Sequence, residues 1–305
     1  MTLQHNYSYP NTLHDSLKIN WRVEDLIGND KSLDFSRPFL PESLARVATL
    51  EGLDAREKLV LNHIRGATYL HLFGLVEEFI LPFAVERARD GIHQSKDRVR
   101  ALLTFAEEEA KHQQLFQRFA EEFKRGFSTP IEFIGPATSI AETVLAHSPL
   151  SVAILILHLE WLTQRHYLES VKTDERLDPQ FTSLLKHHWQ EEAQHAKIDT
   201  LVLEELASQA SPAEIDKAID EFLAIAGILE GGLQQQVHFD LDALERAIGR
   251  KLPPDVRAGI FTAQVSSYRW TFLVSGIDQE NFSKALAQLS ESGLERVRAA
   301  GRALT

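Results

Sequence analysis

The chain contains no cysteine, and this absence excludes several kinds of chemistry. Thiol catalysis, thiolate zinc sites, cysteine-ligated iron–sulfur clusters and disulfide frameworks all depend on cysteine sulfur. With 305 residues, the chain is long enough to form a sizeable core without a disulfide. A metal site in this protein would therefore be built from oxygen and imidazole ligands.

Basic residues are outnumbered by acidic ones. The chain has 32 lysines and arginines against 44 aspartates and glutamates, which gives a formal charge of −12. A protein that binds the nucleic-acid backbone needs a basic face, so we expect no nucleic-acid partner. The hydrophobic content of 44% and the charged content of 25% are ordinary for a folded globular protein and argue against disorder.

Long apolar runs are also missing. The longest, residues 150–157, is followed by His158 and falls far short of the roughly 20 residues that span a bilayer. Residues 1–20 lack the charged and apolar regions of a signal peptide. These absences predict a soluble, cytoplasmic protein without a membrane partner.

Glycine and proline, at 15 and 11 residues, are few and cluster at intervals along the chain. A capping residue followed by proline marks three helix starts, at Ser148-Pro149, Asp178-Pro179 and Ser211-Pro212. Between such signals the apolar residues recur with a helical period, so we expect an all-α protein. The expected helices span residues 54–90, 96–125, 137–146, 149–173, 179–208, 212–230, 233–249, 254–275 and 280–301.

No segment resembles a linker between independent units, so we expect a single all-α domain over residues 1–305. Residues 1–53 are mixed in composition and predict an irregular N-terminal arm. Residues 54–208 contain the four long helices and predict a four-helix bundle. Residues 209–305 predict additional helices that cover the bundle, with a kink between two of them at the glycine pair 231–232.

Two of the long helices carry a Glu-x-x-His pair, Glu109 with His112 and Glu192 with His195. Residues three apart on a helix share a face, so a carboxylate and an imidazole in this spacing can reach one metal ion. The motif alone is weak, because a chain with 13 histidines and many glutamates contains such pairs by chance. The residues around the pairs carry more weight than the pairs themselves.

A further glutamate, Glu160, lies within an otherwise apolar helical run, and an ionised carboxylate there costs several kcal/mol without a partner. Binding of a metal ion to Glu160, its protonation, or an ion pair with Arg165 would each offset this free-energy cost. On the first long helix, Glu77 has an apolar face, while Glu78 has a mixed one and stays open as an alternative. Glu77 fits a repeat, because 77, 109 and 112 precede 160, 192 and 195 by the same 83 positions.

Together these residues give a Glu, a Glu-x-x-His, a Glu and a Glu-x-x-His on four successive helices. Four carboxylates balance the charge of two divalent cations, and a ligand set of oxygens with imidazoles suits iron or manganese. Di-iron and di-manganese carboxylate proteins of the ferritin-like class have this ligand set. His188 shares the face of Glu192 and His195, whereas the neighbouring His187 points about 100° away.

These motifs resemble the ferritin-like non-haem di-iron proteins over about residues 54–208, and His188 makes the chain similar to the p-aminobenzoate N-oxygenase family. The resemblance implies a ferritin-like four-helix bundle that binds two iron ions, with manganese as the alternative. It implies no catalytic side chain beyond the metal ligands. The implied ligands are Glu77, Glu109, His112, Glu160, His188, Glu192 and His195.

The resemblance further implies an oxygenase or oxidase that uses O2, an external electron donor and a small organic substrate. Amine N-oxygenation is the leading reaction, and a homodimer is the expected assembly. The alternative is a ferritin-like protein that handles metal or peroxide without an organic substrate. Asp199 and Gln113 are candidates for orienting the imidazoles, and we expect the acidic pair Glu107-Glu108 to lie on a solvated face.

Overall fold

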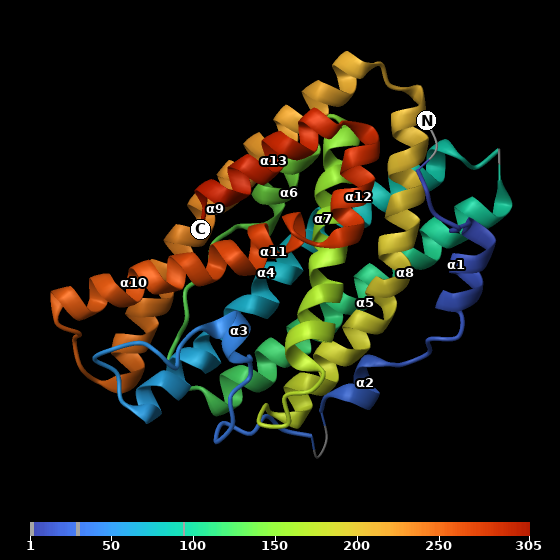
Figure 1. Ribbon diagram of the computed structural model, residues 1–305. Coiled ribbons are helices and arrows are strands. Elements are labelled where there is room, and N and C mark those ends of the chain that lie inside the picture. Colours follow the sequence, from blue (N-terminus) through green and yellow to red (C-terminus); the bar gives the residue numbers. More distant parts are fainter. Residues whose placement is uncertain (1–2, 29–30, 94) are drawn as a thin grey trace.

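The computed structural model describes residues 3–28, 31–93 and 95–305. These residues form helices and loops, with one isolated β-bridge between Gly28 and Lys31. The prediction of an all-α protein is confirmed (Figure 1).

Four long helices pack in two pairs, α4 along α5 and α7 along α8, and the short helix α6 connects the pairs. Each long helix begins at a capping side chain that accepts a hydrogen bond from a backbone N–H three residues on, which satisfies a donor the helix itself leaves free. The five helices are α4 (Ala55–Asp90), α5 (Lys96–Gly126), α6 (Ala137–Leu145), α7 (Pro149–His166) and α8 (Pro179–Gln209).

Helix α4 is the core helix of the bundle. By length and composition alone it is apolar enough to cross a membrane, but most of its apolar stretch is buried inside this protein. It also buries polar groups that a lipid-facing helix would not carry, among them Arg65 and Glu77. Pro82 has no N–H to donate to the Glu78 carbonyl, so one helical hydrogen bond is missing just beyond Glu77.

The N-terminal arm is more ordered than the sequence suggested, because three short helices interrupt it. Helix α1 lies against α5 and α8, on the side of the bundle opposite α9 (Figure 1). The side chain of Asn62 on α4 fixes a later part of the arm, accepting from the N–H of Phe39 at 2.7 Å and donating to the Leu40 carbonyl. The arm helices are α1 (Tyr9–Ser16), α2 (Val23–Leu26) and α3 (Glu42–Ala45).

The C-terminal helices lie along the other side of the bundle, where α9 packs on α4 and α7 (Figure 1, orange to red). Short π-helical segments follow α7 and α10. The elements of this part are η1 (Tyr167–Val171), α9 (Pro212–Ile248), α10 (Pro254–Arg269), η2 (Trp270–Val274), α11 (Ser275–Ile277), α12 (Glu280–Leu289) and α13 (Glu291–Ala303).

Two predicted helix boundaries in this part were wrong. Helix α9 runs without a break through Gly231 and Gly232, because the helix-forming sequence on both sides outweighs roughly 1 kcal/mol for each glycine. Conversely, the predicted helix 280–301 is two helices. Ser290 adopts an extended conformation and its hydroxyl caps α13 through the N–H of Gly293.

Candidate metal centre

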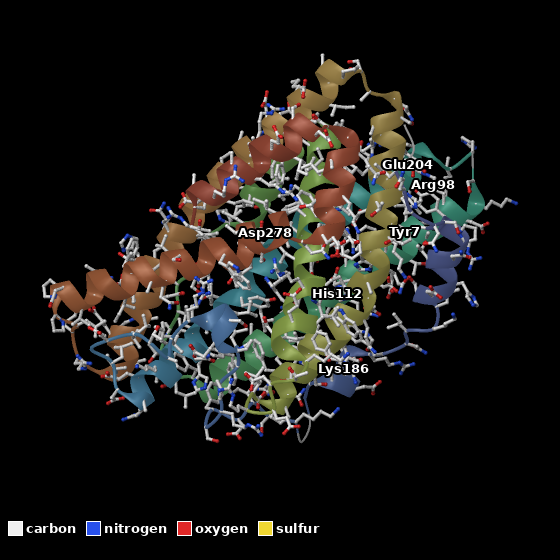
Figure 2. The ribbon with its side chains drawn as sticks, viewed as in Figure 1. Tyr7, Arg98, His112, Lys186, Glu204 and Asp278 are labelled. Carbon is white, nitrogen blue, oxygen red and sulfur yellow. The ribbon has the colours of Figure 1, made fainter. Side chains whose placement is uncertain are left out.

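All seven predicted ligands are buried in the middle of the bundle, each no more than 3% exposed. Every helix of the bundle contributes, as the sequence predicted. Figure 2 labels one of them, His112, in the interior. The ligands are Glu77 on α4, Glu109 and His112 on α5, Glu160 on α7, and His188, Glu192 and His195 on α8.

Six of the seven form two overlapping groups, in each of which the potential ligand atoms lie within 4.8 Å of one another. One group joins Glu77, His112, His188 and Glu192, and the other joins Glu109, His112, Glu192 and His195. Two adjacent groups that share a carboxylate have the arrangement that a two-metal site requires.

Glu192 is the shared carboxylate and lies between the three imidazoles. Its Oε1 is 2.7 Å from Nε2 of His188 and 3.1 Å from Nδ1 of His112, while its Oε2 is 3.0 Å from Nδ1 of His195. With its two oxygens directed at different imidazoles, Glu192 would help these imidazoles to hold metal ions in the cluster.

Glu160 lies outside these two groups but faces the same space. It lines a cavity of about 10 Å³ together with Glu77, Glu109, His188 and Glu192. That volume is about the size of one water molecule, so the centre has room for a very small ligand only.

The structure separates the residues that the sequence left ambiguous. Glu77 belongs to the buried cluster, with its Oε1 3.4 Å from Nε2 of His188, whereas Glu78 lines a different, larger cavity. His187 lies outside the cluster and its Nδ1 is hydrogen-bonded to the Ser183 carbonyl at 2.7 Å.

Two glutamates that the sequence analysis missed hold the outer nitrogens of the imidazoles. Glu191 on α8 contacts Nε2 of His112 on α5, and Glu108 on α5 contacts Nε2 of His195 on α8, both at 2.9 Å. His112 and His195 therefore each present Nδ1 to the cluster, and the carboxylate behind each imidazole sets its orientation and raises its basicity. Lys111 donates to Glu191 at 2.5 Å.

The prediction that Glu108 lies on a solvated face is wrong, since this side chain is buried. Asp199 and Gln113, proposed from the sequence for the orienting role, do not make these imidazole contacts. The signal that could have found the true partners is the residue before each ligand glutamate, because both motifs read Glu-Glu-x-x-His.

Without bound cations, ionisation is disfavoured for three of the four carboxyl groups in the cluster. Burial, reinforced by the neighbouring carboxylates, raises the pKa values of Glu77, Glu109 and Glu160 above their ordinary range. Burial also disfavours ionisation of Glu192, but the adjacent His188 and His195 outweigh it and hold the pKa of that carboxyl well below its usual value. Cations at the centre of the cluster would neutralise these carboxylates.

Buried polar atoms without a hydrogen-bond partner also indicate that the cluster needs cations. Glu77 Oε2, Glu109 Oε2 and Glu160 Oε2 are fully buried and have no hydrogen-bond partner among the described residues. Buried polar atoms normally find a partner, since leaving one unsatisfied costs about 1–3 kcal/mol. The donor set, its charge and its free atoms thus fit two divalent metal ions, with iron or manganese preferred by these ligands.

The N-terminal arm closes the centre on the α5 side. The indole of Trp21 stacks on the imidazole of His112 with ring centroids 6.0 Å apart, and the Lys111 ammonium lies 4.1 Å from the indole centroid. This cover keeps water from the outer face of His112, where Glu191 is bound.

The chain is similar to a known protein family. The family model of p-aminobenzoate N-oxygenase AurF matches residues 5–230. Similar solved structures include variants of an R2-like ligand-binding oxidase. One has an Fe/Fe cofactor, 15% identity and a TM-score of 0.44 over 88% of this chain and 95% of that chain. Another has a Mn/Fe cofactor, 14% identity and a TM-score of 0.45 over 89% and 94%.

No curated protein matches the chain. The family model covers well over half of the 305 residues, including all seven clustered side chains. The chain therefore belongs to the AurF family of p-aminobenzoate N-oxygenases and is a di-metal oxidoreductase that uses O2.

Proposed function

We propose that the protein transfers one oxygen atom of O2 to the nitrogen of a small organic amine. In the first turnover an N–O bond forms, the O–O bond breaks, and the second oxygen atom leaves as water. Conversion of R–NH2 and O2 to R–NHOH and H2O consumes two electrons and two protons. An external electron donor must supply the electrons.

The observation that supports this proposal most directly is the position of His188. Its imidazole is an additional potential ligand in the buried cluster, and the chain belongs to an N-oxygenase family. Its Nε2 lies within reach of both Glu77 and Glu192, so it adds a nitrogen ligand to one of the two groups. A cavity between α4 and α5, large enough for an organic molecule, further supports a substrate beyond O2.

Two iron ions, with manganese as the alternative, would supply the redox chemistry that activates O2 when bound. The protein's own contribution is to hold and orient. The four glutamates and three histidines of the cluster would hold the ions, and Glu108 and Glu191 fix the imidazoles of His195 and His112 at Nε2. Trp21 and the buried helix faces exclude water from the centre.

The test is a single turnover of the iron-loaded, chemically reduced protein with ¹⁸O2 and a panel of primary amines. We expect mass spectrometry to find one ¹⁸O atom in the hydroxylamine product. His188→Ala should keep the fold and lose most of this product. O2 consumption without oxygenated amine would instead favour a metal-handling or peroxide-handling protein, and so would assembly into a large shell by light scattering.

A further inference from the structure

A second cavity, of about 690 Å³, lies between α4 and α5. This is within the usual range of small-molecule sites, about 300–1,000 Å³. Its lining residues on α4 extend from Ala67 to Glu78, which at 1.5 Å per residue is about 16 Å along the helix. On the antiparallel α5 the lining extends from Gln113 to Lys124, so the cavity is elongated along the helix pair.

One end of this cavity lies at the level of the metal centre. Glu78 and Gln113, which line that end, directly follow the clustered residues Glu77 and His112 in the chain. The other end lies near Phe127 and Lys124, about three helical turns away.

The aromatic ring of Phe116 borders both the cavity and the cluster. Phe116 lines the cavity, and its ring centroid is 5.1 Å from that of His188. Opposite it, Gly74 presents no side chain, and a Cβ built there would meet Phe116 at 4.0 Å. Phe116 is therefore a wall residue of the cavity that also lies against an imidazole of the cluster.

The walls are mainly aromatic and aliphatic, with charge at the two ends. The Glu78 carboxylate is half-buried at the metal end, and no hydrogen bond or ion pair to it is found among the described residues. Lys124 lies at the opposite, exposed end. A carboxylate at the end of an apolar cavity favours a ligand with an N–H group and an apolar body, because a hydrogen bond to a charged acceptor is about twice as strong as a neutral one.

We infer that this cavity binds the substrate, and that the substrate is a long, predominantly apolar amine. Its nitrogen is held by Glu78 beside the metal centre, its body extends between α4 and α5, and Phe116 is the ring it displaces to reach the cluster. This inference rests on the proposed function, since it specifies the amine. Glu78 acts as a positioning residue, and the adjacent glutamates 77 and 78 thus serve metal and substrate separately.

The experiment measures binding of decylamine and of decan-1-ol by calorimetry to the full-length, metal-free protein without O2. Glu78→Gln should weaken decylamine binding at least about tenfold, while decan-1-ol changes less than about twofold. Ala120→Trp, which fills the cavity from an exposed position on its rim, should weaken both ligands at least about tenfold. Glu86→Gln, an exposed carboxylate two turns further along α4, is the matched control and should bind both ligands like the wild type.

Circular dichroism and melting temperatures verify that each variant is folded. The inference is overturned if Glu78→Gln binds decylamine like the wild type, if decan-1-ol loses as much affinity as decylamine, or if Ala120→Trp changes neither. These outcomes are separate from the proposed function. Binding as expected with no ¹⁸O incorporation would refute N-oxygenation alone. Incorporation with decylamine as substrate, but unaltered binding in both variants, would refute the cavity assignment alone.

Discussion

At the scale of single residues, neighbouring glutamates in this chain have different roles. Successive residues of a helix point about 100° apart, so Glu77 faces the cluster while Glu78 faces the larger cavity. The same rotation separates Glu191, which holds His112, from Glu192, which lies between the three imidazoles. Sequence spacing and apolar faces pointed to the clustered glutamates and histidines but left Glu78 open beside Glu77, and the full set came from the resemblance to a known family.

The residues behind the imidazoles were beyond such reasoning. Glu108 reaches His195 and Glu191 reaches His112, so each contact crosses from one helix to another far along the chain. Helical periodicity identifies the face on which a residue lies, but it does not identify the side chain opposite that face. For this reason the sequence pointed to near neighbours of the imidazoles instead.

Removing the carboxylate behind an imidazole should weaken metal binding without removing a ligand. We expect Glu191→Ala and Glu108→Ala each to lower iron affinity about 10–100-fold, because the imidazole loses its orientation and part of its basicity. Competition with a chelator measures the change. Glu107→Ala, at an exposed position on the same helix as Glu108, is the control and should bind iron normally. Equal affinity in all three variants would contradict the assigned role.

A buried carboxylate outside the centre predicts a pH dependence of stability. Asp240 on α9 accepts hydrogen bonds from Thr68 and Gln236, both at 2.9 Å, and from Tyr268. Burial raises its pKa from 3.8 to about 6, although the nearby Arg65 guanidinium opposes the shift. Because the pKa of Asp240 is higher in the folded chain than in the unfolded chain, its protonated form contributes to the free energy of unfolding. This contribution is fully present below about pH 3.8 and is lost as the pH rises through about 6.

Asp240→Asn tests this directly, since the amide does not ionise. Between pH 4 and pH 7 the wild type should lose up to about 3 kcal/mol of unfolding free energy relative to the variant. Urea denaturation at several pH values measures the difference. Asp242→Asn, a more exposed carboxylate on the same helix, is the control and should follow the wild type. A constant difference between wild type and Asp240→Asn across this range would show that Asp240 does not ionise there.

At the scale of the helices, most boundaries followed from local chemistry that the sequence displays. Asp54, Ser95, Ser148 and Asp178 each cap a bundle helix at or next to the predicted start. One exception is the break before α13, and the other is α9, where glycine was taken as a break. Glycine permits a kink but does not impose one, and in α9 the residues on either side keep the helix continuous.

This continuity predicts that α9 is stabilised by removing a glycine. Gly231→Ala should raise the unfolding free energy by about 0.5–1 kcal/mol, because a Cβ there meets no atom within 4 Å and alanine restricts the unfolded chain. Gly232→Ala is the matched comparison and should gain less, since its Cβ would lie 3.3 Å from Ile134 Cδ1. Loss of stability in Gly231→Ala, measured by thermal or urea unfolding, would mean that α9 bends at this position.

At the scale of the whole molecule, residues far apart in the chain close one centre. Trp21 of the N-terminal arm covers His112 on α5, and Asn62 on α4 fixes the arm at Phe39. The sequence indicated an arm and a C-terminal cover by composition, but contacts over such separations depend on how the helices pack. The fold class was therefore predictable from local patterns, while the closure of the site was not.

Metal binding should couple this closed centre to the stability of the entire protein. The carboxylates and imidazoles of the cluster are brought together only in the folded chain, so ions bound there favour folding over unfolding. For metal at about 100 times its dissociation constant the gain is about 2.7 kcal/mol, which for a protein of this size corresponds to a melting temperature higher by about 4 °C. Calorimetry of iron-loaded and chelator-treated protein measures this shift.

Glu160→Gln separates stabilisation by metal from stabilisation by the cluster itself. In the metal-free protein this variant should melt no lower than the wild type, because burial raises the pKa of Glu160 and makes its ionised form costly. With iron present the order should reverse, since the variant has lost a carboxylate ligand and binds metal less tightly. If chelation left the wild-type melting temperature unchanged, or if the difference between Glu160→Gln and the wild type were the same with and without iron, the buried cluster would be a structural feature of the bundle and not a metal centre.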